Sequence, residues 1–547
     1  MFCWVEDSVN QYYSKQLFVN DIIAAFIVTA LLIPQSIAYA MLAGLPPQVG
    51  LFSSILPIVV YSLFGSSTTL SVGPVAIISL MTASAIGSVS ENVDVGYAEA
   101  SIVLALLSGL FLVLFGLFRL GLIINFISKP VVSGFITASS LIIVAKQIDH
   151  FSAFDISSFN STLALGVTCL TILLLNKQFG TQIFSRLMPA GIANLISKAV
   201  PFFLVVLASC MSFFFDLEAI GVAVVGYIPQ GLPSISFAEV DVSIVEKLAL
   251  PALMISLIGY VESVSVAQTL GAKKRETIIP NRELIGLGAS NIASGLSGGM
   301  PVTGGFSRSA VNFEAGAATK LSNLYVALGV ALAALFLTPY IYYLPKVVLA
   351  SLIIVAVIGL MEFVVFKRTW LYSKSDFLAV AATVVITLTS GVEAGVISGV
   401  IISLCLHLYR TSKPHIAEVG LLEGTEHFRN VKRFDVTTCL RVLSVRQDES
   451  LFFANAEMLQ AYVLNELYKR DQIAHVIIQC SAVNEVDYSA LTMLENLNKK
   501  LFEQGVLLHL SEVKGPVDDK LATAGFYDRL TGNKYLSQYD AFEALKR

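Results

Sequence analysis

The sequence predicts a polytopic α-helical membrane protein followed by a small α/β domain. Of its 547 residues, 55% are hydrophobic and only 14% are charged, whereas a soluble domain of ordinary composition carries about 25% charged residues. No Asp, Glu, Lys, Arg or His occurs between Asp21 and Glu91, and charges become frequent only near residue 411. We therefore expect a transmembrane domain over 1–410, a linker over 411–435 and an α/β domain over 436–547.

Charge and cysteine content argue against several other classes of protein. The net charge is −4 and no basic stripe with interleaved aromatic residues is present, so we do not expect nucleic acid as a partner. The six cysteines form no CxxC pair and no metal-ligand spacing, so neither a metal site nor a cofactor is predicted. The first apolar run lacks a basic segment before it and is long enough to span, which favours a retained helix over a cleaved signal.

Long apolar runs give the positions of the membrane spans, because a helix needs roughly 20 residues to cross the hydrocarbon core. We count fourteen such spans, and the stretch 180–200 is compatible with an additional interfacial helix. The spans lie near 21–43, 49–65, 74–89, 98–118, 130–146, 162–176, 201–216, 248–270, 282–297, 306–317, 320–338, 345–365, 375–390 and 392–410.

Basic residues in the loops indicate the orientation of the chain. With a cytoplasmic N-terminus, the loops after even-numbered spans include the clusters 273–275 and 367–368, which are Lys-Lys-Arg and Lys-Arg. Loops rich in Lys and Arg remain in the cytoplasm. We therefore expect an integral protein of the inner or plasma membrane with both termini in the cytoplasm. A miscount by two spans gives the same pattern, so the parity is better supported than the number.

Two of the predicted spans are short and begin at clusters of Gly and Pro. One follows Gly73-Pro74, and the other follows the segment 299–308, which contains Gly304 and Gly305. Half-length helices in corresponding positions of two halves are typical of a transporter binding site. The Pro-Val pair at 74–75 recurs at 301–302, an offset of 227 (301 − 74 = 227). Seven spans in each half make the second half an inverted copy of the first.

The chemistry of these two half-helix starts favours an anion. A helix start exposes unpaired backbone N–H groups and partial positive charge, and two starts that face each other form an anion cradle. Thr303 and Ser307 offer hydroxyl donors, and Arg308 adds a full positive charge. A re-entrant loop without a ligand, and an Arg308 that extends to the membrane interface, are the alternatives.

Glu262 lies deep inside an otherwise apolar predicted span. A carboxylate at this depth is costly unless it is paired or protonated, so it indicates function. Its separation from Gln35 is the same 227 positions (262 − 35 = 227). We expect Glu262 to couple proton movement to transport, with a static ion pair to Arg308 as the alternative.

Three segments resemble the SulP family of sulfate permeases and related solute-carrier anion transporters. They are Ile33–Phe52 (IPQSIAYAMLAGLPPQVGLF), Ser71–Leu80 (SVGPVAIISL) and Pro301–Gly316 (PVTGGFSRSAVNFEAG). The resemblance implies a 7+7 inverted repeat of the uracil-permease type, divided into core and gate domains, and a homodimer.

The resemblance also implies roles for individual residues. Gln35 and Tyr39 of the first span, Val75 after the first Gly-Pro, and Ser307 with Arg308 would line the substrate site between the two half-helices. A glutamate at the position of Glu262 occurs in proton-coupled members of the family, whereas sodium-coupled bicarbonate members are expected to differ there.

The last 110 or so residues alternate between short apolar strands and amphipathic helices, as in a small α/β domain. This region resembles the STAS domain that follows the membrane part of SulP transporters, which implies a possible cytoplasmic regulator as partner. Within the loop 484–490, Ser489 matches the phosphorylated serine of anti-sigma-factor antagonists, but Ala490 replaces the usual glycine. The competing interpretation is that Asp487 and Ser489 cap the helix that follows.

Together these features predict a secondary active transporter, not an enzyme, that takes up sulfate with protons by an elevator-like alternating-access movement. A dicarboxylate or bicarbonate transporter is the nearest alternative. A passive anion channel and a membrane anion sensor are alternatives from other classes.

Overall fold

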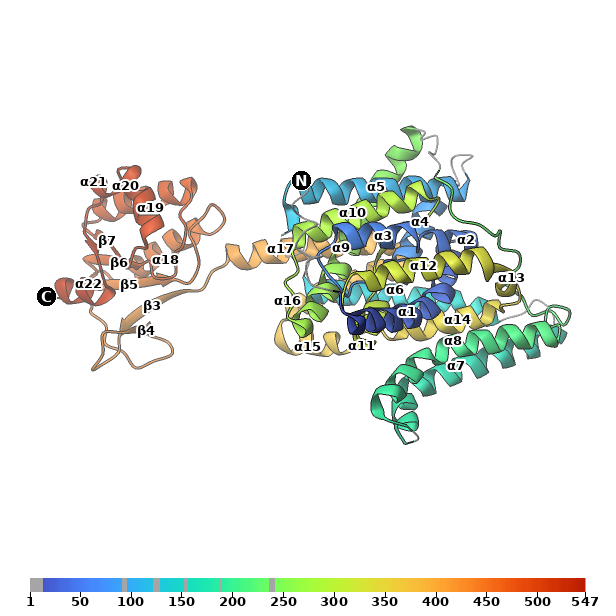
Figure 1. Cartoon of the computed structure of the whole chain (residues 1–547). Coiled ribbons are helices and arrows are strands. Elements are labelled where there is room, and N and C mark those ends of the chain that lie inside the picture. The colour runs from blue at the N-terminus through green and yellow to red at the C-terminus, as the bar shows by residue number, and fades with distance from the viewer. Residues whose placement is uncertain are drawn as a thin grey trace. The chain divides into compact units, whose positions relative to one another are not determined.

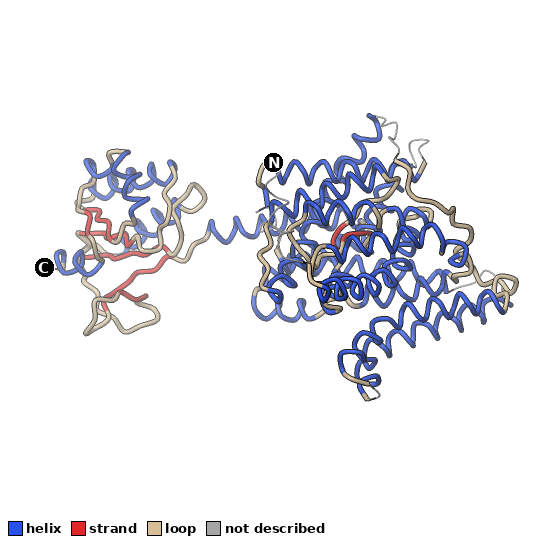
Figure 2. Tube along the Cα trace, in the orientation of Figure 1, coloured by secondary structure: helices blue, strands red, loops and turns tan. Residues whose placement is uncertain are grey.

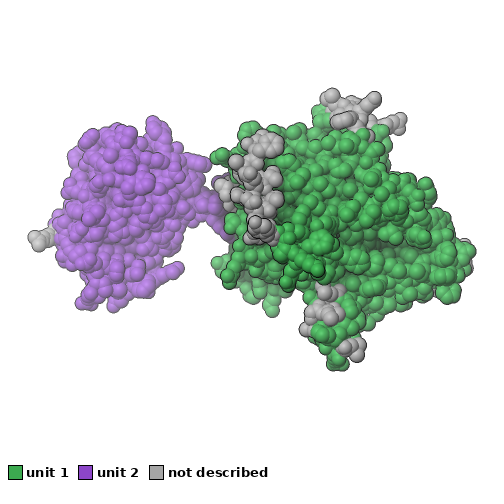
Figure 3. Space-filling view, in the orientation of Figure 1, with its two compact units in different colours: residues 1–403 green, residues 404–547 purple. Residues whose placement is uncertain are grey.

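A computed structural model describes residues 13–90, 96–121, 128–151, 156–186, 188–235 and 242–546. The chain divides into two compact units, residues 1–403 and 404–547 (Figure 3). The boundary between the units falls inside the last membrane helix. The first unit is almost entirely helical, and the second is an α/β domain (Figure 1).

Helices occupy each of the stretches in which a span was predicted. The elements of the first unit are α1 Lys15–Leu42, α2 Pro47–Phe52, α3 Leu56–Phe64, β1 Val72–Gly73, α4 Ala76–Ser90, α5 Tyr97–Leu117, α6 Lys129–Ile148, a 3-10 turn Asp149–Phe151, α7 Ile156–Ser185, α8 Ala190–Phe214, α9 Val242–Lys274, α10 Pro280–Leu296, β2 Thr303–Gly304, α11 Phe306–Glu314, α12 Leu321–Phe336, α13 Thr338–Ile341, α14 Lys346–Ile358, α15 Val364–Tyr372, α16 Lys374–Ser390 and α17 Val392–Ser412.

Eight helical segments in the described ranges are long and apolar enough to cross a membrane by themselves. Three further apolar helices, Ala76–Val89, Leu321–Phe336 and Lys346–Ile358, are shorter than a full span. The first unit is therefore a membrane domain, whereas the count of fourteen spans stays a prediction.

The packing of the membrane domain relates elements from its two halves. α5 packs against α9 and α10, and α12 packs against α1 and α3. Close approach of backbones makes some of this packing possible. A Cβ atom added to Gly50 of α2 would lie 2.0 Å from the Ser36 carbonyl oxygen of α1, so only glycine fits at this crossing.

The second unit is a six-stranded sheet flanked by helices. Its elements are β3 Ile416–Leu421, β4 Phe428–Asn430, β5 Val442–Gln447, α18 Ala456–Lys469, β6 His475–Gln479, α19 Tyr488–Glu503, β7 Leu507–Ser511, α20 Gly515–Thr523, α21 Phe526–Arg529, β8 Lys534–Tyr535 and α22 Gln538–Leu545. The strand order is β4-β3-β5-β6-β7-β8. The pairs from β5 to β8 are parallel, and β3 pairs antiparallel with β4 and β5.

The segment predicted to be a linker, 411–435, departs from that prediction because it holds β3 and β4. Ala417 pairs with Arg446 of β5, so the sheet of the soluble unit begins well before residue 436. Buried Ala417 and Val419 alternate in β3 with the more exposed Glu418. In the sequence, this short alternation beside a charged loop looks like a linker. It is a strand in the structure because β5 supplies its hydrogen-bonding partner.

Candidate functional site

Two very short strands bring the two half-helix starts together in the middle of the membrane domain. β1 and β2 pair antiparallel, with Val72 opposite Gly304 and Gly73 opposite Thr303; Figure 2 shows the pair in red among the helices. α4 begins directly after β1 at Ala76, and α11 begins directly after β2. Both helix N-termini, with their partial positive charge, therefore start from one small element.

Side chains from neighbouring helices hold this strand pair in position. The Ser71 backbone N–H donates to Ser309 Oγ of α11 at 2.9 Å. Asn291 of α10 binds both backbone groups of one residue, since Nδ2 donates to the Val302 carbonyl and Oδ1 accepts from the Val302 N–H, each at 2.9 Å. Buried backbone groups that a two-residue strand leaves unpaired are satisfied in this way.

Thr303, which the sequence predicts as a substrate contact, lies behind the cavity rather than in its lining. Its hydroxyl donates to the Gly259 carbonyl of α9 at 2.6 Å and lies 2.6 Å from Ser263 Oγ. Ser263 Oγ in turn accepts from the Gly304 N–H at 2.8 Å. Thr303 thus joins β2 to α9, and its hydroxyl is already used within the protein.

Arg308 is the charged group at the centre of the candidate site. It is 3% exposed, and its Nη1 donates to the Pro74 carbonyl at 2.8 Å. Among the described residues, no partner exists for its buried Nε and Nη2. A guanidinium that is buried with free N–H groups carries a large desolvation penalty. The geometry therefore favours an anion whose oxygens accept from these two groups.

Two glycines make room for the Arg308 guanidinium. A Cβ atom at Gly73 would lie 3.2 Å from Nη1, and one at Gly305 would lie 3.0 Å from Nη2. These distances are shorter than ordinary van der Waals contact, so a side chain at either position would push against the arginine. The Gly-Pro and Gly-Gly sequences at the helix starts therefore serve the approach of Arg308 as well as the chain turn.

A cavity surrounds these groups. The residues that line it are Gln35, Tyr39, Pro74, Val75, Ala76, Glu262, Gly305, Phe306, Ser307, Arg308, Ala356, Val357 and Leu360. Most of the predicted site residues are therefore brought together. The sequence argument missed the wall formed by α14, because an apolar run in a span carries no sign of what it faces.

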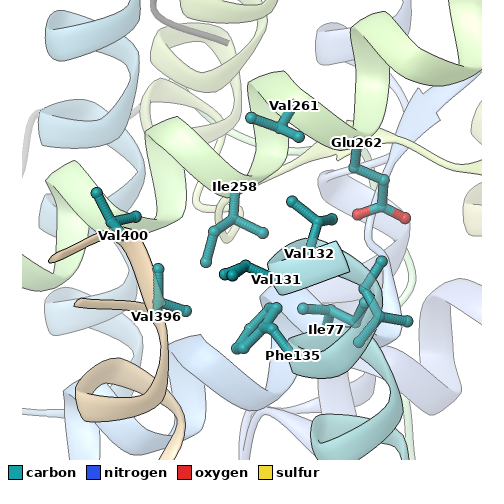
Figure 4. A pocket seen from close by; sticks show the side chains of 10 residues that line it. Ile77, Val131, Val132, Phe135, Ile258, Val261, Glu262, Val396 and Val400 are labelled. Carbon is teal, nitrogen blue, oxygen red and sulfur yellow. The ribbon is translucent and has the colours of Figure 1, made fainter. Parts of the chain in front are cut away.

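Glu262 lies on the α9 side of this cavity. Glu262 and Arg308 form no ion pair, and Glu262 Oε2 is buried without a partner in the part of the chain that the structure describes. The alternative of a static ion pair is thus not observed. Glu262 also lines a second, apolar cavity between α4, α6, α9 and α17, where it is the single acidic side chain among valine, isoleucine and phenylalanine (Figure 4).

A buried carboxylate that the sequence argument did not single out fixes the segment before β1. Glu283 of α10 is fully buried and accepts from the Tyr61 hydroxyl at 2.7 Å, the Ser66 N–H at 2.7 Å and Oγ at 2.6 Å, and the Ser67 N–H at 3.1 Å. The turn from α3 towards β1 is therefore tied to α10. A glutamate one turn inside a helix does not reveal this role in the sequence.

In the soluble unit, the prediction that Asp487 caps a helix is confirmed. Its Oδ1 accepts from the Ala490 N–H at 2.8 Å, and its Oδ2 accepts from the Phe453 N–H at 2.8 Å. Ser489 lies in the first turn of α19 and is exposed. Its hydroxyl is not the capping group, and its phosphorylation stays a prediction.

The helical membrane domain, the paired half-helix starts and the parallel sheet define a membrane transporter with an attached STAS domain. The model of the sulfate permease family matches residues 18–383, and that of the STAS domain matches residues 433–541. The chain belongs to the sulfate permease family.

Relatives cover nearly the whole chain. It is 34% identical to sulfate transporter 4.1, chloroplastic, of Arabidopsis thaliana, over 96% of this chain and 80% of the relative. It is 30% identical to the probable sulfate transporter MT1781 of Mycobacterium tuberculosis, over 95% of this chain and 93% of the relative.

Solved structures show the same fold at lower identity. Murine Slc26a9, an anion transporter described in the inward-facing state, has a TM-score of 0.89 with 22% identity over 99% of this chain and 93% of that chain. The transmembrane domain of the cyanobacterial bicarbonate transporter BicA has a TM-score of 0.60 with 20% identity, over 72% of this chain and 98% of that chain.

Proposed function

We propose that this chain is a secondary active transporter that takes up sulfate together with protons. The observation that carries the proposal is the buried Arg308 guanidinium, which lines the cavity at two helix N-termini and whose Nε and Nη2 have no partner among the described residues. A tetrahedral dianion offers several oxygens to such a set of donors at once. The relatives named as sulfate transporters support sulfate as the substrate.

Glu262 supports proton coupling. Its carboxylate faces the same cavity as Arg308 and borders an apolar cavity, where an unpaired charge is costly. When a dianion enters, the site holds two anionic groups against one arginine. Protonation of Glu262 offsets this excess, so binding of sulfate and of a proton favour each other.

The two walls of the Arg308 cavity come from different groups of helices, which supports an elevator-like movement. α1, α4, α9 and α11 supply the polar side, whereas α14 supplies Ala356 and Val357, and Leu360 follows just after the end of α14. A smooth apolar wall opposite a polar cradle allows the cradle to move without breaking hydrogen bonds. In a 7+7 repeat, the fourth span corresponds to the eleventh and the first span corresponds to the eighth. The packing of α5 (span four) on α9 (span eight) therefore has its counterpart in the packing of α12 (span eleven) on α1 (span one), which supports the 7+7 repeat.

The remaining predictions belong to the same proposal. The basic loops support cytoplasmic termini, and the STAS domain with its exposed Ser489 supports a cytoplasmic regulator. A homodimer in the lipid bilayer is proposed from the family resemblance.

Uptake of labelled sulfate into proteoliposomes tests the anion site. Arg308→Ala should weaken apparent sulfate affinity by at least 100-fold, because a buried charge-assisted contact contributes about 3 kcal/mol. Arg368→Ala is the matched control, since Arg368 is exposed on α15. Normal sulfate affinity of Arg308→Ala would remove the cradle from the proposal. Competition by bicarbonate, fumarate, succinate and chloride separates the alternative substrates.

The same vesicles test coupling. An inward proton gradient should increase sulfate accumulation by the wild-type chain, and Glu262→Gln should abolish this increase while leaving exchange of internal and external sulfate. Glu246→Gln serves as control, because Glu246 is exposed on the same helix. Proton-driven accumulation that persists in Glu262→Gln would exclude Glu262 as the coupling group, and accumulation against a gradient would exclude a passive channel.

A further inference from the structure

One face of α1 and one face of α14 meet along a continuous seam that extends beyond the Arg308 cavity. On α1, Gln35 and Tyr39 line the Arg308 cavity, whereas Ala38 and Leu42 line a second, smaller cavity. These four positions have the i, i+3, i+4, i+7 spacing of a single helix face. The two cavities are therefore neighbours along α1, and the positions that line the second are shifted by three residues, or about 4.5 Å at 1.5 Å rise per residue.

α14 repeats this arrangement. Ala356 and Val357 near the end of α14, and Leu360 just after it, line the Arg308 cavity. One to three turns earlier, α14 lines the second cavity with Lys346, Leu349, Ala350 and Ile353. We call this contact the α1–α14 seam. Where it lines the second cavity, the seam consists of small and apolar side chains that are at most 8% exposed, namely Ala38, Leu42, Leu349, Ala350 and Ile353.

The second cavity differs from the seam in its chemistry. Three polar side chains also line it: Gln147 near the end of α6, His150 in the 3-10 turn that follows α6, and Lys346 at the start of α14. We call these three residues the basic mouth. It presents an ammonium group, a ring N–H and a carboxamide, which are all donors for an anion. Asp149 is adjacent in the chain but does not line the cavity.

We propose that the basic mouth is a second anion-binding station on the transport path, at the end of the α1–α14 seam opposite Arg308. This inference rests on the proposed function, because it takes the Arg308 cavity as the transport site. A positive charge at the entrance of a narrow path, here the Lys346 ammonium, raises the local concentration of anions and their rate of entry. Apart from Lys346, the side chains with which α1 and α14 line the second cavity are apolar, so movement of α1 past α14 breaks no side-chain hydrogen bond between them there.

The station explains why polar groups gather at this end of the seam. Lys346 is the first residue of α14, and its backbone N–H donates to the Ala223 carbonyl at 2.8 Å. Its side chain lines the cavity and, among the described residues, forms no salt bridge with a carboxylate, whereas His150 has the Asp149 carboxylate of its own turn nearby. The α6 helix places Lys146 only one turn before His150, yet Lys146 is exposed and outside the lining. Lys146 is therefore a matched control, because it carries the same charge one turn away but does not line the cavity.

Initial rates of sulfate uptake test the station in the full-length chain. Lys346→Gln should raise the apparent KM for sulfate about 3- to 10-fold with the maximal rate unchanged within twofold, and its KM should depend less on ionic strength. His150→Gln should act in the same direction, Lys346→Arg should restore the wild-type KM, and Lys146→Gln should leave it unchanged. A wild-type KM in Lys346→Gln, or an equal shift in Lys146→Gln, would overturn the proposal.

A labelling experiment tests the same station without turnover. In purified protein, His150→Cys should react faster with an anionic methanethiosulfonate than with a cationic one, and millimolar sulfate should slow the anionic reaction severalfold. Both effects should vanish when Lys346→Gln is added. Absence of sulfate protection would refute the station even if transport is normal. Conversely, protection in a chain that transports none of the tested anions would refute the proposed function and leave the station intact.

Discussion

Replacement of Glu283 by alanine should destabilise the membrane domain and disturb the proposed anion site together. The substitution removes one acceptor from four donors: the Tyr61 hydroxyl, the Ser66 N–H and hydroxyl, and the Ser67 N–H. A buried donor left without a partner costs roughly 1–3 kcal/mol, and hydroxyls recover part of this by rotating, so we expect a loss of about 3–5 kcal/mol.

Glu283→Gln separates hydrogen bonding from charge. Oε1 accepts three of the four bonds, from Ser66 and Ser67, whereas Oε2 accepts only from Tyr61. A glutamine with its carbonyl at the Oε1 position keeps the three bonds, and the Tyr61 hydroxyl can turn to accept from the new amide. This variant should therefore lose no more than about 1–2 kcal/mol.

The assay is the apparent melting temperature of detergent-solubilised protein, with sulfate-dependent stabilisation measured on the same samples. Glu283→Ala should melt well below wild type and lose the stabilisation by sulfate, because the turn it anchors leads directly into β1 and α4. Glu283→Gln should lie close to wild type in both. Equal melting of wild type and Glu283→Ala, or a glutamine variant as unstable as the alanine variant, would refute this reasoning.

Two further predictions concern the arginine and the soluble domain. Gly305→Ala places a methyl group 3.0 Å from Arg308 Nη2. Sulfate affinity in proteoliposomes should therefore fall about tenfold, or about 1.4 kcal/mol, while folding is retained. Unaltered affinity would show that the guanidinium can move aside. In the soluble unit, burial lowers the pKa of His509 to about 4, and its Nδ1 accepts from the Asn533 N–H at 2.9 Å while its Nε2 lies 3.1 Å from His475 Nδ1. Because the unfolded histidine binds a proton near pH 6.5 and the folded one does not, stability is complete above pH 6.5 and should fall by up to about 2 kcal/mol by pH 5. Pulse proteolysis of the soluble domain in urea at the two pH values measures this loss, which His509→Gln should lack; an equal pH dependence in that variant would assign the effect to other groups.

Most of the residues predicted for the site line one cavity, and the sequence could indicate them because their signals are local. Gly and Pro at 73–74 and 304–305 stop helices wherever they occur, so the half-helix starts follow from the chain itself. Arg308 and Glu262 stand out because charges are rare in apolar spans. Thr303 was placed wrongly in the cavity lining, because a hydroxyl beside a helix start can face either the ligand or a neighbouring helix, and here it faces Gly259.

Other features depended on contacts that the sequence does not display. The roles of Glu283 and Asn291 arise from bonds to segments far away in the chain. β3 was read as part of a linker, because a strand of six residues acquires its identity from its pairing with β5.

By itself, the sequence determined the membrane domain, the soluble α/β domain, the two helix starts and the residue types at the proposed anion site. These follow from hydropathy, helix-breaking residues and charge, which act over a few neighbouring positions. The tertiary structure decided which groups face the cavity, how β1 pairs with β2, and that α1 and α14 form a seam between two polar cavities. Those properties require the meeting of helices that are hundreds of residues apart, and only folding brings them together.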